Sequence, residues 1–221
     1  MELFHFHLKG MYDNKYKEGS ILDINPNKFN NRLYTRIYTS NVTVPCNDYR
    51  AIVDVINRYA IAAGLGYFDG RMNIGELFDY ALRRQVSPEE LYKLLTDARD
   101  IILPMGTNLR EMAMEEYRRD NCPDKPSRLH SLYACSEEGL SYWSKRICDG
   151  VTDVLRIEVE DNPFVSNEKL LPDEGLDYSN KIISSYKYFN PKSKDLDPTS
   201  NEYLIQGKVR ILEKVDEIRR G

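Results

Sequence analysis

Apolar residues alternate at strand spacing near both ends of this chain and recur at helical spacing across its middle third. Segment 3–8 is rich in aromatic residues and lacks glycine and proline, while segments 33–39 and 154–159 alternate in polarity; these patterns predict strands. Between residues 47 and 121 the apolar residues instead follow the spacing of one helical face. The pattern predicts an α+β fold, with strands at both ends and helices between them.

The predicted helices have recognisable start and stop signals. Asn47 or Asp48 is a suitable N-cap, and Gly64 ends the same helix. A later helix begins at Ser87, with Pro88 in the first helical position, where a missing N–H costs nothing. Helices are predicted at residues 47–64, at 74–84, from 87 onward and at 108–119.

Two prolines mark the end of the helical block. Pro123 and Pro126 disfavour helical backbone in the residue before each of them, so a new element is expected to start after them. The later elements are strands at 130–135, 154–159, 203–205 and 209–212, a helix at 136–147, and a helix or extended stretch around 182–189. The last residues are expected to form a charged tail. The block at about 47–121 is thus a helical insertion in a single domain spanning 1–221.

Composition limits the classes of function. With 221 residues and a hydrophobic content of 41%, the chain can bury a substantial core. A net charge of -4 gives no general attraction to nucleic acids or anionic membranes, so a nucleic acid is expected only as a substrate. No apolar run has the length of a membrane span and no secretory signal is recognisable, which predicts a cytoplasmic protein without a membrane partner. The scattered cysteines predict neither a metal site nor a disulfide framework.

Glu202 is the residue with the strongest candidate chemistry. It stands between a polar, proline-marked loop at 190–198 and a short apolar run. Taken alone, such a glutamate is usually a solvated residue at a junction of loop and strand. However, the segment Asn201–Ile205, followed by 209–212, resembles the final strands of ADP-ribosyltransferases of the diphtheria-toxin and poly(ADP-ribose) polymerase type. In that superfamily the glutamate at this place is catalytic.

Two further segments resemble the same superfamily, in the same order along the chain. The N-terminal strand is similar to the first strand of the superfamily, where His5 matches the motif histidine best. His7 is the alternative, because it lies on the same face of a strand. The strand that contains Tyr133 and the helix that contains Tyr142 are similar to the segments that supply two stacking tyrosines. The resemblance therefore implies a triad of His5, Tyr133 and Glu202.

The residue types suit the reaction that the resemblance implies. ADP-ribosyl transfer breaks the bond between the ribose and the nicotinamide of NAD, so positive charge develops on the sugar. A fixed carboxylate stabilises this charge, which is the role implied for Glu202. The rings of Tyr133 and Tyr142 would hold the nicotinamide between them.

Four other residues are implied in binding NAD, and they have plain structural alternatives. His5 or His7 would bind the adenosine ribose, and Arg128 would reach the pyrophosphate, since guanidinium pairs with phosphate in a fork. Ser131 would also contact NAD. Equally, both histidines suit a buried strand and Arg128 suits an ion pair with a neighbouring acid. No Gly-x-Gly-x-x-Gly motif is present, so NAD would not bind as in a Rossmann fold.

The expected activity is mono-ADP-ribosyl transfer from NAD to a macromolecular acceptor, which is RNA, DNA or protein. The resemblance implies a split antiparallel β-sheet core carrying the helical insertion. By analogy with bacterial and phage members, it also implies a toxin or antiviral defence protein, with an antitoxin or inhibitor as a further partner. Two alternatives stay open on the same fold. One is NAD hydrolysis or RNA 2′-phosphotransfer, and the other is a catalytically silent binding module.

Overall fold

The computed structural model divides the chain into two compact units. The first contains Met1–Thr39 and Arg110–Gly221, and the second contains Ser40–Leu109. The structure describes residues 1–9, 15–31, 34, 106–147, 150–173 and 176–220, almost all of them in the first unit. The helices predicted at 47–64, at 74–84 and from 87 lie outside these residues, as does nearly all of the strand predicted at 33–39. The helical insertion therefore stays a prediction.

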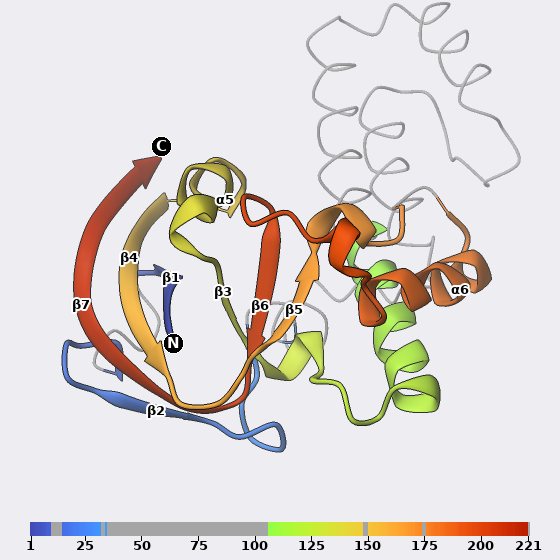
Figure 1. The fold of residues 1–221 in the computed structure, drawn as a ribbon, viewed down its shortest axis with the longest axis horizontal. Helices are drawn as coiled ribbons and strands as arrows, with labels where there is room; N and C mark the ends of the chain where they lie inside the picture. The colour runs from blue at the N-terminus through green and yellow to red at the C-terminus, as the bar shows by residue number, and fades with distance from the viewer. Residues whose placement is uncertain (10–14, 32–33, 35–105, 148–149, 174–175, 221) are drawn as a thin grey trace, which may run out of the picture. The chain divides into compact units, whose positions relative to one another are not determined.

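The described residues form seven strands in two antiparallel sheets (Figure 1). Sheet A has the order β1-β4-β7-β2, and sheet B has the order β3-β6-β5. The strands are β1 (Glu2–Leu8), β2 (Ile21–Ile24), β3 (Leu132–Ala134), β4 (Gly150–Val159), β5 (Phe164–Asn167), β6 (Asn201–Ile205) and β7 (Gly207–Arg220). The described residues thus combine helices with antiparallel sheets, an arrangement compatible with the predicted α+β class.

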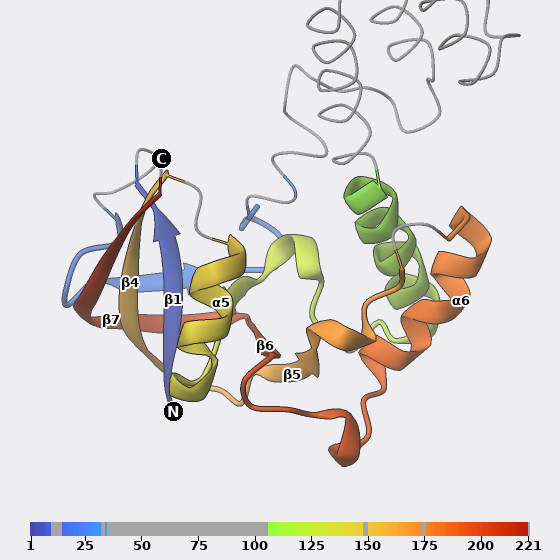
Figure 2. The same ribbon diagram turned by 90° about the horizontal axis from the view of Figure 1, so that it is seen from above.

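Helices accompany both sheets in the described part of the first unit. α5 (Leu140–Ile147) follows β3, and α6 (Tyr178–Phe189) precedes β6. The chain is also helical at 106–121, of which residues 110–121 belong to the first unit and are called the 110–121 helix below. This helix lies beside α6 (Figure 2). Tyr178 of α6 donates to Glu116 of this helix at 2.7 Å. None of the helices in the described ranges has the length and apolar character needed to cross a bilayer.

The first core cluster joins the two sheets. Its buried residues come from β1, β2, β4 and β7 of sheet A and from β3 and β6 of sheet B. They are Leu3, Ile24, Leu132, Ala134, Leu155, Ile157, Val159, Tyr203, Ile205, Val209 and Ile211. In β4 and β7 these residues alternate with polar ones, because successive side chains of a strand point to opposite faces. Each sheet therefore buries one face against the other.

The second core cluster covers the other face of sheet B. It consists of Met114, Cys122, Tyr188, Phe189 and Leu204, with Tyr133 packed against it. These residues come mainly from the 110–121 helix, α6 and β6. Sheet B is thus covered on both faces, and all five residues of β6 are buried. Because a strand in this position is normally apolar throughout, the polar residues of β6 need partners.

β1 links the two sheets. It pairs along its whole length with β4 of sheet A, while Phe4 forms an isolated antiparallel bridge with Cys135, just after β3. Both backbone hydrogen bonds of this bridge are 2.9 Å long. The strand predicted at 3–8 is therefore confirmed, and it lies beside β3 as well as β4.

The C-terminal segment differs from its prediction. The strand predicted at 209–212 extends in the structure to Arg220 as β7, so the prediction of a charged tail is wrong. β7 pairs with β4 over most of its length, with register shifts along the way. Because this segment is rich in charged residues, its sequence does not show the alternation of apolar and polar residues that marks a strand. In the structure these charged residues pair across the sheet surface, as Lys214 does with Asp153 at 2.6 Å.

β2 and β5 are strands that the sequence does not predict. Each has four residues, which are too few to show a clear period. They form because neighbouring strands offer unpaired backbone groups, β7 to β2 and β6 to β5. Tertiary pairing, and not local pattern, therefore decides that these segments are strands.

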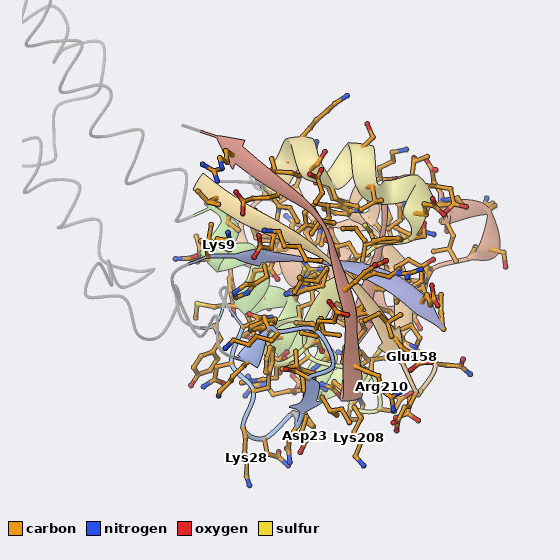
Figure 3. All side chains as sticks on the ribbon, turned by 90° about the vertical axis from the view of Figure 1, so that its left-hand side faces the viewer. Lys9, Asp23, Lys28, Glu158, Lys208 and Arg210 are labelled. Atoms are coloured by element: carbon orange, nitrogen blue, oxygen red, sulfur yellow. The ribbon has the colours of Figure 1, made fainter. Side chains whose placement is uncertain are left out.

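The face of sheet A that points away from the first core cluster carries charged side chains (Figure 3). Glu158 of β4 and Arg210 of β7 lie 3.8 Å apart, with 47% and 54% of their side chains exposed. Lys9 lies 3.5 Å from Asp153. An exposed pair such as Glu158 and Arg210 contributes only about 0–1 kcal/mol. This face is therefore a solvated surface, and the apolar interior of the fold consists of the two core clusters.

Truncation within β7 tests whether this strand belongs to the core. Ile211 is 1% exposed, whereas Val215, at a register shift of the same strand, is 42% exposed. We expect Ile211→Ala to lower the free energy of unfolding by about 2–5 kcal/mol and Val215→Ala to lower it by less than ~1 kcal/mol. Urea unfolding followed by circular dichroism measures both. Equal, small losses would mean that β7 does not contribute to the core.

Candidate active site

Glu202 is a carboxylate on a strand that is buried on both faces. It is the second residue of β6 and is 6% exposed. Tyr203 and Ile205 belong to the first core cluster, so the alternation of the strand turns Glu202 to the side of Leu204 and the second core cluster. The 110–121 helix and α6 cover this side of sheet B (Figure 2). The candidate site therefore lies between sheet B and these two helices.

Buried polar contacts hold the backbone at the start of β6. Trp143 of α5 donates from Nε1 to the main-chain carbonyl of Asn201 at 3.0 Å. Asn167 of β5 donates from Nδ2 to the side-chain oxygen of Asn201 and to the hydroxyl of Ser200, each at 3.0 Å. All four of these residues are buried. The backbone that carries Glu202 is thus held independently of the contacts of its own side chain.

One oxygen of the Glu202 carboxylate receives all of the hydrogen bonds that described residues donate to it. Tyr188 Oη donates to Oε2 at 2.6 Å, and Arg128 Nη1 donates to the same atom. No described residue donates to Oε1. The carboxylate therefore has one anchored oxygen and one oxygen with free acceptor capacity. The side chain is 7% exposed.

Arg128 connects Glu202 to a second buried glutamate. It begins a short 3-10 turn, Arg128–His130, that leads into β3. Its Nε donates to Glu111 Oε2 at 2.7 Å, and its Nη2 donates to Glu111 Oε1 at 3.3 Å. Burial would lower the pKa of Arg128, but the two carboxylates raise it well above its ordinary value. Burial likewise acts to raise the pKa of Glu111, yet Arg128 and Arg110 together lower it. Both groups are therefore charged.

Two tyrosine rings lie against the guanidinium of Arg128. Its Cζ is 5.2 Å from the ring centroid of Tyr133 and 4.7 Å from that of Tyr188, within the range of a cation–π contact. The Tyr133 hydroxyl is buried and has no hydrogen-bond partner among the described residues. Such a group is costly to leave unpaired, so this hydroxyl has a hydrogen-bonding capacity that no described residue uses. The Glu202 cluster below means Glu111, Arg128, Tyr133, Tyr188 and Glu202.

The charges of the Glu202 cluster are balanced once the neighbouring Arg110 is included. Arg110 Nη2 lies 3.3 Å from Glu111 Oε1, so the carboxylates of Glu111 and Glu202 are matched by the guanidinium groups of Arg110 and Arg128. Buried charges are tolerated when they are paired in this way. A phosphate group would reach Arg128, which is 4% exposed, only by displacing one of the two carboxylates.

The two predicted histidines make other contacts. His5 shares a face of β1 with Leu3 of the first core cluster, whereas Tyr133 packs against the second. His5 Nδ1 lies 2.8 Å from the main-chain carbonyl of Tyr133; because a carbonyl only accepts hydrogen bonds, Nδ1 carries the proton. His7 is buried and stacks on Tyr16, with ring centroids 3.9 Å apart.

Tyr142 and Ser131 also have partners within the protein. Tyr142 lies on α5, as predicted, and its hydroxyl donates to Glu168. Arg146 stacks on its ring at 5.1 Å. Ser131 is fully buried and donates to the main-chain carbonyl of Ser127 at 2.7 Å. No hydrogen bond joins either residue to Glu202 within the described ranges, so their part in NAD binding stays a prediction.

Of the predicted site residues, the structure gathers Arg128, Tyr133 and Glu202 into one cluster. Its other two members, Glu111 and Tyr188, are not predicted from the sequence. Glu111 could have been considered from the sequence, because it is an acidic residue within the amphipathic helix predicted at 108–119. Tyr188 gave no such signal, since a tyrosine is common on the buried face of a helix.

The family of the chain is shown by a match over nearly its whole length. A family model described as "Protein of unknown function (DUF2441)" matches residues 3–217. The chain belongs to the DUF2441 family. A search of curated proteins found no match. The DUF2441 match begins in β1 and ends in β7, so it includes every residue of the Glu202 cluster.

The Glu202 cluster of this DUF2441 protein has a definite chemical capacity. Its carboxylate is held by one oxygen and keeps acceptor capacity on the other, and the cluster also contains the unpaired hydroxyl of Tyr133. Such a carboxylate can stabilise a cationic centre or take a proton from a bound hydroxyl. Within the described ranges, no three or more His, Cys, Asp or Glu side chains are grouped to hold a metal ion.

The pH dependence of stability tests the surroundings of His5. Desolvation lowers the pKa of His5 from 6.5 to about 4, although its hydrogen bond with Tyr133 acts in the other direction. Below pH 6.5 the unfolded chain takes up a proton that the folded protein accepts only near pH 4, so stability is lost as the pH falls through this window. We expect the free energy of unfolding of the DUF2441 protein to fall between pH 6.5 and 4, and to fall less in His5→Gln.

Urea unfolding of both proteins at a series of pH values measures this difference. Parallel curves for the wild type and His5→Gln would show that the ring of His5 is not desolvated.

Proposed function

We propose that this protein is a mono-ADP-ribosyltransferase that uses NAD, with Glu202 as its catalytic carboxylate. The main support is the state of that carboxylate. Arg128 and Tyr188 anchor its Oε2, while no described residue donates to Oε1. An acceptor oxygen held in this way is suited to bind the 2′-hydroxyl of the nicotinamide ribose and to stabilise positive charge on the sugar. The acceptor of ADP-ribose is RNA, DNA or protein.

In the proposed reaction, the bond between ribose C1′ and the nicotinamide nitrogen breaks. The electron pair leaves with nicotinamide as a neutral base, and positive charge is shared by C1′ and the ring oxygen. An oxygen or nitrogen nucleophile of the acceptor then forms a bond to C1′, and its proton passes to Glu202 or to water. The products are nicotinamide and the ADP-ribosylated acceptor.

The arrangement of strands supports the proposal. β1, which carries the histidines, meets the end of β3 through the bridge between Phe4 and Cys135. β3, which carries Tyr133, pairs with β6, which carries Glu202. These are the three strands whose sequences resemble the superfamily. We therefore propose its split antiparallel core for this chain, with the helical insertion ending before the 110–121 helix, which packs in the second core cluster.

Two groups without a protein partner are assigned to the nicotinamide ribose. One is the Tyr133 hydroxyl and the other is Glu202 Oε1. Tyr133 pairs with Leu204, so Glu202 is its diagonal neighbour on the same face of sheet B, roughly 7–8 Å away between backbones. This separation suits two groups that contact one sugar. The further proposed NAD contacts are His5, His7, Ser131 and Tyr142.

The biological setting is proposed by analogy with compact bacterial and phage members of the superfamily. It is that of a cytoplasmic toxin or defence protein, held in check by an antitoxin or inhibitor. The helical insertion is the proposed place for recognition of the acceptor or of that inhibitor.

Substitution of Glu202 tests the proposal directly. Glu202→Gln keeps the size and one acceptor oxygen of the side chain but removes its charge. We expect kcat for nicotinamide release to fall by about 10²–10³-fold, while NAD still binds, because the lost interaction forms in the transition state. Glu213→Gln is the control, since Glu213 is 45% exposed on β7. Equal loss of NAD binding and turnover would indicate a structural role for Glu202.

Incubation with NAD labelled in its ADP-ribose moiety separates the enzymatic alternatives. Label retained on RNA, DNA or protein supports transfer, whereas free ADP-ribose alone supports NAD hydrolysis. Transfer of a phosphate from 2′-phosphorylated RNA to NAD identifies the phosphotransferase reaction. A silent binding module predicts no reaction with any acceptor, and a cellular phenotype that Glu202→Gln leaves intact.

A further inference from the structure

Both donors to Glu202 reach the same carboxylate oxygen. Tyr188 and Arg128 donate to Oε2, so Oε1 keeps its acceptor capacity and a defined direction. We propose that Arg128, itself held by Glu111, is a positioning residue that grips Glu202 by Oε2 and presents Oε1 to the substrate. This inference rests on the proposed function, because it concerns the same carboxylate. It gives Arg128 a role other than binding the pyrophosphate of NAD.

Arg128 is held on the edge that faces away from Glu202. Its Nε and Nη2 donate to the two oxygens of Glu111, at 2.7 and 3.3 Å, in the two-point geometry that fixes the plane of a guanidinium. The Glu111 side chain is 0% exposed, and its helical neighbours Ala113 and Met114 are also 0% exposed. The 110–121 helix therefore fixes the position of Glu111, and Glu111 fixes the orientation of the Arg128 guanidinium.

The faces of the guanidinium are restricted as well. The rings of Tyr133 and Tyr188 lie 5.2 and 4.7 Å from its Cζ, and Tyr188 Oη accepts from Nη1 at 2.5 Å. The same Nη1 donates to Glu202. Protein groups therefore contact the Nε and Nη2 edge of the guanidinium, both of its faces and its Nη1. These contacts leave Arg128 little freedom to turn toward a ligand.

A lysine in this place would keep the charge but not the geometry. The guanidinium presents donors in a fixed fork, whereas an ammonium is a point charge on a flexible stem. Arg128 uses separate nitrogens for Glu111 and for Glu202, so one rigid plane relates the two carboxylates. Arg128→Lys therefore separates positioning from simple charge balance.

The test compares Arg128→Lys with Arg118→Lys. Arg118 is a matched control, because it donates from Nε and Nη2 to Glu115 at 3.1 and 2.9 Å without contacting Glu202. We expect Arg128→Lys to lower kcat for nicotinamide release by roughly 100-fold, as a misplaced catalytic group does, with KM for NAD near that of the wild type. Arg118→Lys is expected to keep both constants.

Two kinetic results would overturn the inference. If Arg128→Lys retains the kcat of Arg118→Lys, the grip on Oε2 has no part in turnover. If KM for NAD rises while kcat is kept, Arg128 binds the pyrophosphate and does not position Glu202.

Tyr188→Phe gives a second variant in case Arg128→Lys does not fold. It keeps the ring against Arg128 and removes only the hydroxyl that donates to Oε2. We expect kcat to fall on the order of 10-fold, the effect of one hydrogen bond to a charged group, with KM for NAD kept. An unchanged kcat in Tyr188→Phe would count against the positioning of Glu202.

A crystallographic comparison separates failure of this inference from failure of the proposed function. If the wild type releases no nicotinamide with any acceptor, the proposed function is wrong, whatever Arg128 does. Crystal structures of Arg118→Lys and of Arg128→Lys, or of Tyr188→Phe where the lysine variant does not fold, then decide the inference. We expect the Glu202 carboxylate to keep its orientation in the control and to turn or become disordered in the test variant. The same orientation in both would overturn the positioning role.

Discussion

The buried charge of Glu202 is the constraint on which the rest of the described structure depends. A carboxylate on a strand covered on both faces is tolerated only with a compensating cation and hydrogen bonds. Arg128 supplies the cation, Tyr188 supplies a further hydrogen bond, and Glu111 holds Arg128. These contacts join the 110–121 helix, the turn before β3, α6 and β6. Because breaking such a buried pair costs about 3–5 kcal/mol, the residues of the proposed site also contribute to stability.

The two sheets differ in the chemistry of their faces. Sheet A has a charged, solvated outer face and buries only its inner face. Sheet B is covered on both sides, and at the start of β6 Asn201 is paired with Asn167 and Trp143. The unpaired hydroxyl of Tyr133 is therefore out of keeping with its surroundings. Departures from complete pairing in a buried region are typical of functional sites, which supports the assignment of this hydroxyl to a ligand.

Particular elements show why part of the fold was predictable. β1 and α5 agree with the sequence, because an aromatic run without glycine or proline and a helical spacing of apolar residues are both local patterns. The full length of β7 could not be predicted, because ion pairs between neighbouring strands leave no recognisable pattern in the sequence. β2 and β5 are too short to show a period and exist through their pairing partners. In the site, Tyr188 was missed because nothing local distinguishes it from a core tyrosine.

The sequence by itself determined the α+β class, the place of Glu202 at the start of a strand, and the break that puts Arg128 ahead of the strand of Tyr133. These features depend on the conformational preferences of short segments, such as the residues before proline and the alternation of a strand. Only the tertiary structure decided that Arg128 joins Glu202 to Glu111, and that His5 reaches Tyr133 through its main chain. Such contacts depend on which strands pair and which face each strand buries, and residues far apart in the chain settle both.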